Sequence, residues 1–159
     1  MLRLPWRKGL RVVLSTGGET EITQGITLIL RKLSIYAIDV KEFAEAADLV
    51  TYARQKRPDV FIIVLNNIRF TDGRYPTVGS RITGAICLLS ELKEAYGSGM
   101  IALSGWYPDD EGEDGFARRV KTAGADFFFL LPPDGKELVA AVEFCGARSA
   151  AHSTKYFSG

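Results

Sequence analysis

The sequence RPDVFIIVLNN, residues 57–67, decides the fold of this chain. It holds six consecutive apolar residues, Val60 to Leu65, so neither its odd nor its even positions form a polar face. A strand that is apolar on both sides is typical of the centre of a parallel sheet with helices on both faces. Ligands bind such sheets outside the carboxyl ends of the strands, so Asn66, Asn67 and the loop after them are the first candidates for a functional site.

The rest of the chain alternates between short apolar runs and helical patterns. Further strands are predicted over residues 11–15, 35–40, 100–104 and 126–131. Apolar residues at helical spacing predict helices over residues 22–33, 44–56, 81–96 and 114–123, and Asp134 with Glu137 forms a capping-box pattern that opens a last helix. Five strands alternating with five helices predict an α/β fold, a three-layer, doubly wound, five-stranded parallel sheet of flavodoxin-like order 2-1-3-4-5.

Length and composition indicate one globular domain. The chain has 159 residues, of which 47% are hydrophobic and 25% charged. We expect an N-terminal extension over residues 1–9, a domain over residues 10–147 and a C-terminal tail over residues 148–159. No apolar run approaches the roughly 20 residues that a membrane span needs, and the first residues do not form a signal peptide. The protein is therefore expected to be cytoplasmic.

Few reactive side chains are available. With a net charge of +1, the chain has no overall field that would attract nucleic acid or a membrane surface. A single histidine, His152, argues against a His-based metal site or a Ser-His-Asp triad. No nucleophile–base pair stands out, so we expect a non-enzyme without a metal or cofactor. Cys87 and Cys145 fall inside apolar helical patterns and are expected to be small buried hydrophobes.

Three segments resemble the receiver domain of two-component response regulators. The sequence RPD, residues 57–59, resembles the lead into the third strand of that family. The sequence IALSG, residues 101–105, resembles the fourth strand, and GADFFFLLP, residues 124–132, resembles the fifth. The resemblance covers about residues 10 to 145. It implies a receiver-like fold and a role in signal transduction.

The residues that run the phosphorylation switch of that family are missing here. In receivers an aspartate at the end of the third strand takes up the phosphoryl group, and this position falls on Val64 or Leu65. The acidic pair that holds Mg²⁺ is replaced by Ser15 and Thr16, and the lysine of the fifth strand by Leu131. Phosphoryl transfer depends on such charges, so the resemblance implies a pseudo-receiver that cannot be phosphorylated and binds no metal.

Three positions that carry over from the family keep suitable side chains. Ser104 has the hydroxyl that would sense the phosphoryl group, Phe128 lies near the switch aromatic, and Pro132 could follow a cis peptide bond. Core packing is the default for the three phenylalanines of residues 127–129. If their strand lies at the sheet edge, an exposed ring would favour a homodimer through the last α/β units.

The turn STGGET, residues 15–20, has two interpretations. Its hydroxyls and glycines, Ser15, Thr16, Gly17 and Gly18, could cradle a phosphate at the start of a helix, as in flavodoxins. Alternatively it is a tight turn in which Thr20 or Ser15 caps the helix. The first interpretation supports a second hypothesis, a flavodoxin-like protein that binds a nucleotide or flavin.

The long loops supply the other candidates. Arg69 and Arg74, with Arg81, could clamp an anion or could be solvated. Trp106 and Tyr107 could anchor a partner or fold back on the sheet. Our leading hypothesis is a pseudo-receiver that binds another signalling protein through these loops. The ligand-binding candidates are Ser15, Thr16, Gly17, Gly18, Asn66, Asn67, Arg69, Arg74 and Ser104, and the partner-binding candidates are Trp106, Tyr107 and Phe128.

Overall fold

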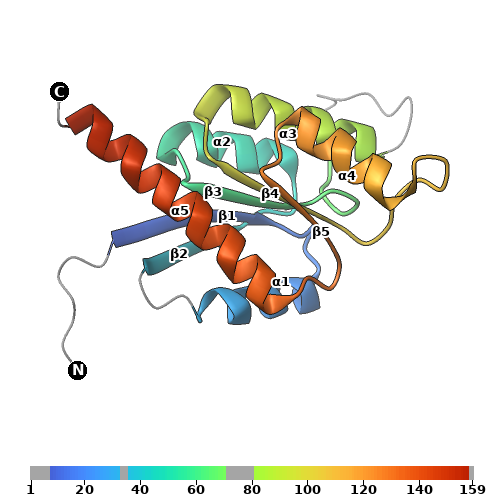
Figure 1. Ribbon diagram of the computed structural model, residues 1–159, viewed down its shortest axis with the longest axis horizontal. Coiled ribbons are helices and arrows are strands. Elements are labelled where there is room, and N and C mark those ends of the chain that lie inside the picture. The colour runs from blue at the N-terminus through green and yellow to red at the C-terminus, as the bar shows by residue number, and fades with distance from the viewer. Residues whose placement is uncertain (1–7, 33–35, 71–80, 158–159) are drawn as a thin grey trace.

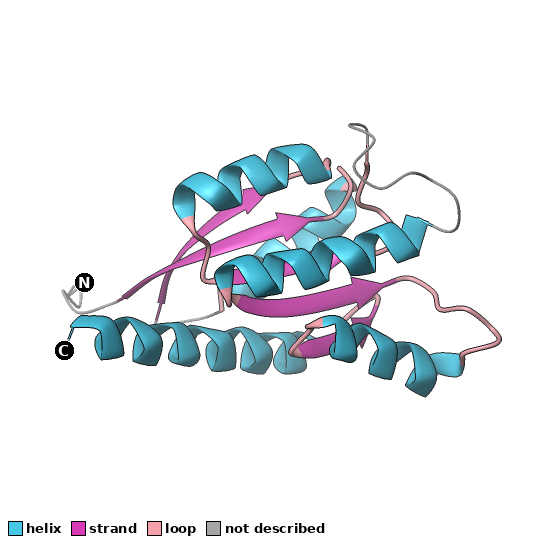
Figure 2. Ribbon diagram, turned by 90° about the horizontal axis from the view of Figure 1, so that it is seen from above, coloured by secondary structure: helices cyan, strands magenta, loops and turns pink. Residues whose placement is uncertain are grey.

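A five-stranded parallel sheet forms the centre of the protein. The computed structural model describes residues 8–32, 36–70 and 81–157. The strands are β1 (Lys8–Ser15), β2 (Tyr36–Glu42), β3 (Val60–Val64), β4 (Gly99–Ser104) and β5 (Phe127–Leu130). Their order is β2-β1-β3-β4-β5 and every pair is parallel, which confirms the predicted flavodoxin-like topology. The strands all point the same way, so their carboxyl ends gather at one edge (Figure 2).

Five helices cover the two faces of this sheet. They are α1 (Thr20–Leu30), α2 (Ala46–Lys56), α3 (Arg81–Tyr96), α4 (Gly112–Ala123) and α5 (Gly135–Phe157). One face is covered by α1 and α5, and the other by α2, α3 and α4 (Figure 1). The result is the expected three-layer arrangement.

The burial of the central strand β3 explains why helices cover both faces of the sheet. Every residue of β3 is fully buried, and successive side chains enter opposite cores. Phe61 and Ile63 pack with α2, α3 and α4, while Val60, Ile62 and Val64 pack on the side of α1 and α5. The apolar faces of the helices also lie in these cores. Their fully or largely buried members are Ile26, Leu30, Ala46, Leu49, Val50, Ala53, Ile82, Ala85, Ile86, Leu89, Leu92, Phe116, Val120, Leu138, Ala141, Val142 and Cys145.

The two ends of the domain differ from the expected limits. Strand β1 begins at Lys8, inside the region predicted as an N-terminal extension. Helix α5 continues to Phe157, although we expected a tail from residue 148. Two contacts hold the helix at the point where we expected the tail to begin. Arg148 lies 2.9 Å from the carboxylate of Asp126, and the Ser149 hydroxyl donates to Asp59 over 2.5 Å.

The helix ends follow from local chemistry in two of three cases. Gly97 has a positive φ of 64° just after α3, which is usual for a glycine that ends a helix. Asp134 caps α5, since its Oδ1 accepts hydrogen bonds from the N–H groups of Lys136 and Glu137 at 2.9 and 3.1 Å. The expectation that Ser15 or Thr20 caps α1 is wrong, because the cap residue is Glu19 and it makes no side-chain cap bond.

The cysteines occupy opposite environments. Cys145 is buried on the inner side of α5, as we predicted for a small hydrophobe. Burial raises the pKa of its thiol to about 11, so the thiol stays protonated. The prediction for Cys87 is wrong, because this residue is exposed. Helix α3 directs Ile86 and Leu88 toward the core, which leaves Cys87 on the outer side.

A charged cluster ties the amino-terminal edge of the sheet together. The carboxylate of Asp126 accepts hydrogen bonds from Lys93 Nζ at 2.9 Å, the Met100 N–H at 2.8 Å and Arg148 at 2.9 Å. Burial alone would raise the pKa of Asp126, but the bonds from Lys93, Met100 and Arg148 outweigh it and lower the pKa below its usual 3.8. The cluster thus joins β4, α3 and α5 through one carboxylate.

The lowered pKa of Asp126 makes a prediction about acid stability. A carboxyl group whose pKa is lower in the folded state stabilises the fold fully above its unfolded pKa, and this contribution is lost as the pH falls through the folded pKa. Replacing Asp126 by Asn should therefore lower the free energy of unfolding by about 2 kcal/mol near neutral pH. The difference from the wild type should shrink as the pH falls below 3.8.

Urea unfolding at neutral pH and in steps from about pH 5 to pH 2 would measure this difference. Asp39→Asn, at an exposed position of β2, is the matched control and should change little. A variant that loses the same stability at every pH would contradict the role of the Asp126 charge.

Candidate functional site

The predicted site residues gather at the carboxyl-terminal edge of the sheet. Ser15 ends β1 and Thr16 follows it, Asn66 and Asn67 follow β3, and Ser104 ends β4. These three strands are neighbours in the order β1-β3-β4, so the turns that leave them are adjacent. We call these residues, together with Gly17, Gly18 and Trp106, the carboxyl edge.

The hydroxyl of Thr16 is held by two neighbours from other elements. It lies 2.6 Å from the Thr23 hydroxyl of α1 and donates to Glu42 Oε1 of β2 at 3.2 Å. The backbone N–H of Thr16 also points to Glu42 Oε1, at 3.4 Å. Thr16 is fully buried. A carboxylate at this point repels a phosphate, so these contacts work against an anion cradle built on Thr16.

The hydroxyl of Ser15, unlike that of Thr16, is not held by a neighbour among the described residues. Its side chain is fully buried, and its Oγ has no hydrogen-bond partner among the residues that the structure describes. It pairs in the sheet with Ile63 of the central strand. Leaving a hydroxyl unpaired in a buried position costs about 1–3 kcal/mol.

Two glycines shape the turn after β1. Gly17 and Gly18 have φ values of 68° and 82°, which L side chains rarely adopt. A Cβ at Gly17 would lie 2.2 Å from the carbonyl oxygen of Asn67. The glycine is therefore needed so that the turns after β1 and β3 can touch, and that contact occupies the space that a phosphate cradle would need at Gly17.

Hydrogen bonds also join the turns after β3 and β4. Asn66 Oδ1 accepts from the Gly105 N–H at 3.0 Å, and Asn66 Nδ2 donates to Asn67 Oδ1 at 3.3 Å. The Ser104 hydroxyl donates to the Trp106 carbonyl at 2.5 Å and lies 3.3 Å from the Trp106 N–H. The carboxyl edge is thus braced from Asn67 to Trp106, and Ser104 holds the backbone of the exposed tryptophan.

The positions that matter in receivers carry apolar side chains or hydroxyls here. Val64 and Leu65, where the phosphoacceptor would lie, are both fully buried. Leu131, at the position of the lysine, packs against the core on the side of α1 and α5. None of these three side chains has a nucleophilic atom or a charge.

The residues at this edge do not fit the magnesium site of a receiver. Mg²⁺ requires oxygen ligands in near-octahedral geometry, usually with one or two carboxylates. Among the described residues, the hydrogen bonds at this edge include one carboxylate, that of Glu42. It already accepts a hydrogen bond from the Thr16 hydroxyl. Within residues 8–32, 36–70 and 81–157 there is no group of three or more His, Cys, Asp or Glu side chains that could hold a metal ion.

The predicted partner-binding aromatics have different surroundings. Trp106 is 47% exposed, whereas Tyr107 is partly buried against the core beneath α2, α3 and α4. Phe128 is also partly buried there and meets Phe116 edge-on, with ring centroids 5.5 Å apart. Of the three, Trp106 offers the most accessible ring.

The predicted cis peptide bond before Pro132 is present.

The predicted arginine clamp is not assembled by any contact in the described part of the chain. Arg69 is exposed, and its backbone pairs with Glu45, Ala44 and Ala46 at the start of α2. Within the described residues, its side chain makes no hydrogen bond or ion pair with Ser15 or Asn66. Arg74 lies outside the described residues.

Sequence reasoning missed two contributors to this edge. Glu42 and Thr23 surround Thr16, yet neither was predicted as a site residue. Glu42 could have been found from the alternation that continues past Val40, because β2 extends two residues beyond its predicted end. Thr23 had no comparable signal, since its role depends on how α1 packs over β1.

Comparison with solved structures shows many proteins of similar fold. The REC domain of AraT, a response regulator from Geobacillus stearothermophilus, matches with a TM-score of 0.64 and 18% identity over 91% of this chain and 98% of that one. The Francisella response regulator 1452 receiver domain matches with a TM-score of 0.61 and 18% identity over 88% and 98%. NtrX from Brucella abortus gives 0.69 and 14% over 95% of this chain and 30% of its own.

The chain has the fold of a response-regulator receiver domain. Identities of 14–18% show the fold and not the chemistry. No protein-family model matches the sequence, and no curated protein matches it either. Over the described residues of this receiver-like chain, no helix is long and apolar enough to cross a membrane.

The contact between the turns after β1 and β3 can be tested by adding one methyl group. Gly17→Ala should destabilise the fold by about 2 kcal/mol or more, because alanine is strained at this φ and its Cβ would collide with Asn67. Thermal or urea unfolding would measure the loss.

The matched control is a glycine within α1. A Cβ at Gly25 meets nothing within 4 Å, so Gly25→Ala should raise stability by roughly 0.5–1 kcal/mol. Equal stability of the Gly17→Ala variant and the wild type would refute the close approach of the two turns.

Proposed function

We propose that this protein is a pseudo-receiver, a signalling module that is not phosphorylated and that acts by binding another signalling protein. The observation that carries the proposal is Val64. It ends the central strand, where receivers have their phosphoacceptor, and it is a fully buried hydrocarbon side chain. A receiver-like fold without a nucleophile at this point has no aspartyl phosphate to form.

The surroundings of Val64 support the same proposal. Thr16 and Ser15 stand where a metal-binding acidic pair would lie, and Leu131 stands where the lysine would lie. Phosphoryl transfer is catalysed almost entirely by positioned charge, from metal ions and cationic side chains. Replacing one such group would slow the reaction, and replacing all of them removes its basis. We therefore assign no enzymatic activity to this protein.

The proposed output surface is the loop after β4. Trp106 presents a large aromatic ring to solvent, and hydrogen bonds from and to Ser104 fix its backbone. Tryptophan is enriched among the residues that dominate the energy of protein interfaces. Because its backbone is already held, less entropy is lost when a partner covers this half-exposed tryptophan. These features favour Trp106 as an anchor for the partner.

The last α/β units supply a second surface, which we assign to self-association. Strand β5 is an edge strand, and Phe144 of α5 is 51% exposed. The Phe144 ring meets Phe127 edge-on at 5.5 Å, and the Arg148 guanidinium lies 5.8 Å from its centroid. An aromatic ring that is supported from the core and left uncovered favours contact with a second copy.

The absence of phosphorylation can be tested directly. Incubation with Mg²⁺ and acetyl phosphate should leave the intact mass unchanged, because no carboxylate lies at the position of Val64. A receiver domain that phosphorylates itself under the same conditions is the positive control.

A stable adduct of about 80 Da on an aspartate would overturn the proposal.

The alternative, a flavodoxin-like binder, makes a different prediction for the same preparation. A nucleotide or flavin at 100 times its Kd would stabilise the fold by about 2.7 kcal/mol. Thermal shifts with ATP and FMN therefore separate the two functions, and we expect no shift.

Two single substitutions distinguish the two surfaces. Trp106→Ala should weaken capture of the signalling partner at least tenfold, because an interface anchor contributes about 2 kcal/mol or more. Phe144→Ala, which removes an aromatic ring of similar exposure elsewhere, is the matched control and should leave that capture unchanged.

Sedimentation of the same variants measures self-association. Phe144→Ala should reduce the dimer fraction and Trp106→Ala should not. Partner capture that survives Trp106→Ala would remove the loop after β4 from the proposal.

A further inference from the structure

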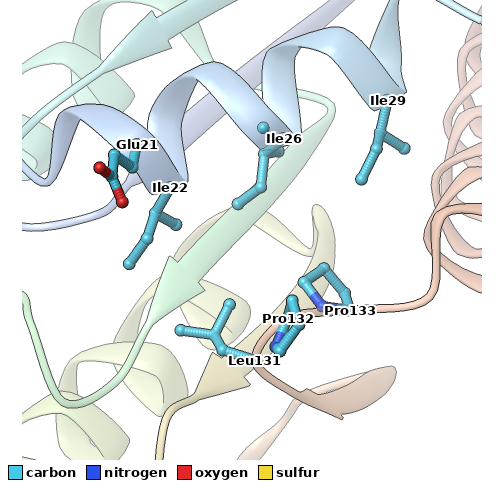
Figure 3. Close-up of a pocket in the computed structure, with 8 residues that line it drawn as sticks. Glu21, Ile22, Ile26, Ile29, Leu131, Pro132 and Pro133 are labelled. Carbon is cyan, nitrogen blue, oxygen red and sulfur yellow. The ribbon is translucent and has the colours of Figure 1, made fainter.

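An apolar pocket lies between helix α1 and the segment that joins β5 to α5 (Figure 3). Its volume is about 380 Å³, within the range of roughly 300–1,000 Å³ that is usual for small-molecule sites. Side chains from the two segments face each other across it. These are Ile22, Ile26 and Ile29 on one side and Leu131, Pro132 and Pro133 on the other.

The walls of the pocket are part of the core. Ile26 is buried and forms the floor, while Ile22, Ile29 and Leu131 are half-buried and pack against the core between the sheet, α1 and α5. The rim is exposed at Pro132. A ligand would therefore enter a preformed hollow, and little ordering of the protein would be needed.

Gly25 keeps one side of the pocket open. It lies within α1, where glycine lowers helix stability relative to alanine. A Cβ at this position would meet nothing within 4 Å, so no packing constraint demands glycine. The effect of the missing side chain is to leave space beside Ile22 and Ile29.

One charged group lines this pocket, the carboxylate of Glu21. It lies at the end of the pocket nearest the start of α1 and is exposed (Figure 3). No ion pair is formed with Glu21 by any residue of the described ranges. An apolar hollow with a single anion at its end suits a ligand with a compact apolar body and one positive charge.

We propose that this pocket binds a small primary amine, whose hydrocarbon body lies against the isoleucines and prolines and whose ammonium group pairs with Glu21. The volume is that of roughly a dozen water molecules in the liquid, enough for one ring and a short chain. The inference does not rest on the proposed function, because the pocket contains neither Val64 nor Trp106.

Phenethylamine is a suitable probe, with 2-phenylethanol and 3-phenylpropionate as neutral and anionic probes of the same shape. Each is titrated into the whole chain, and the backbone N–H resonances of Gly25 and Leu131 are followed by NMR. The amine should bind roughly two- to fivefold more tightly than the alcohol, which is the size expected for an exposed charge pair. The carboxylate should bind most weakly.

Variants assign the binding to this pocket. Gly25→Leu should fill the hollow and weaken the amine at least tenfold, and Gly25→Ala is a smaller filler in case the first variant does not fold. Glu21→Gln should lower the affinity for the amine to that for the alcohol. Leu28→Ala, an exposed position of the same helix outside the lining, is the control and should bind like the wild type. Equal affinity for all three probes, or binding that survives both Gly25 variants, would overturn the proposal.

Discussion

Burial of β3 on both faces is the constraint on which the rest of the structure depends. A strand without a solvent face needs a layer of helices on each side, and the alternation of its side chains supplies both cores from one run of five residues. The same burial limits what can lie at its carboxyl end. Val64 is the last residue of the strand and belongs to the core between the sheet, α1 and α5. The apolar core thus extends to the position at which a receiver has a reactive carboxylate.

Apart from the Glu42 carboxylate at Thr16, the carboxyl edge is held by neutral contacts. Gly17 lets its turn approach Asn67, and Asn66 binds the Gly105 N–H. In a site built around acids and a metal ion, charge would carry much of this bracing, whereas here backbone and amide groups do so. Such contacts depend on shape and change little with ionic strength.

Much of this architecture follows from the sequence alone. The order of the strands and the inward faces of the helices could be predicted, because apolar periodicity reports burial directly. The capping of α5 by Asp134 and the turn at Gly97 could be predicted because both are local. Glu42 could not be placed beside Thr16, since that contact joins segments 26 residues apart. Cys87 was misassigned because an apolar residue in a helical run can still face solvent.

A backbone hydrogen bond joins the pocket to the carboxyl edge. Leu131 lines the pocket, and its N–H donates to the Ser104 carbonyl at 2.9 Å. The Ser104 side chain in turn holds the Trp106 carbonyl at 2.5 Å. A ligand against Leu131 is thus separated from the exposed tryptophan by one buried residue. Coupling through such a chain requires that the ligand favour one of two arrangements of Leu131, because a ligand that binds both arrangements equally shifts neither. This short path is a physical means by which occupancy of the pocket at α1 could alter the backbone that holds Trp106.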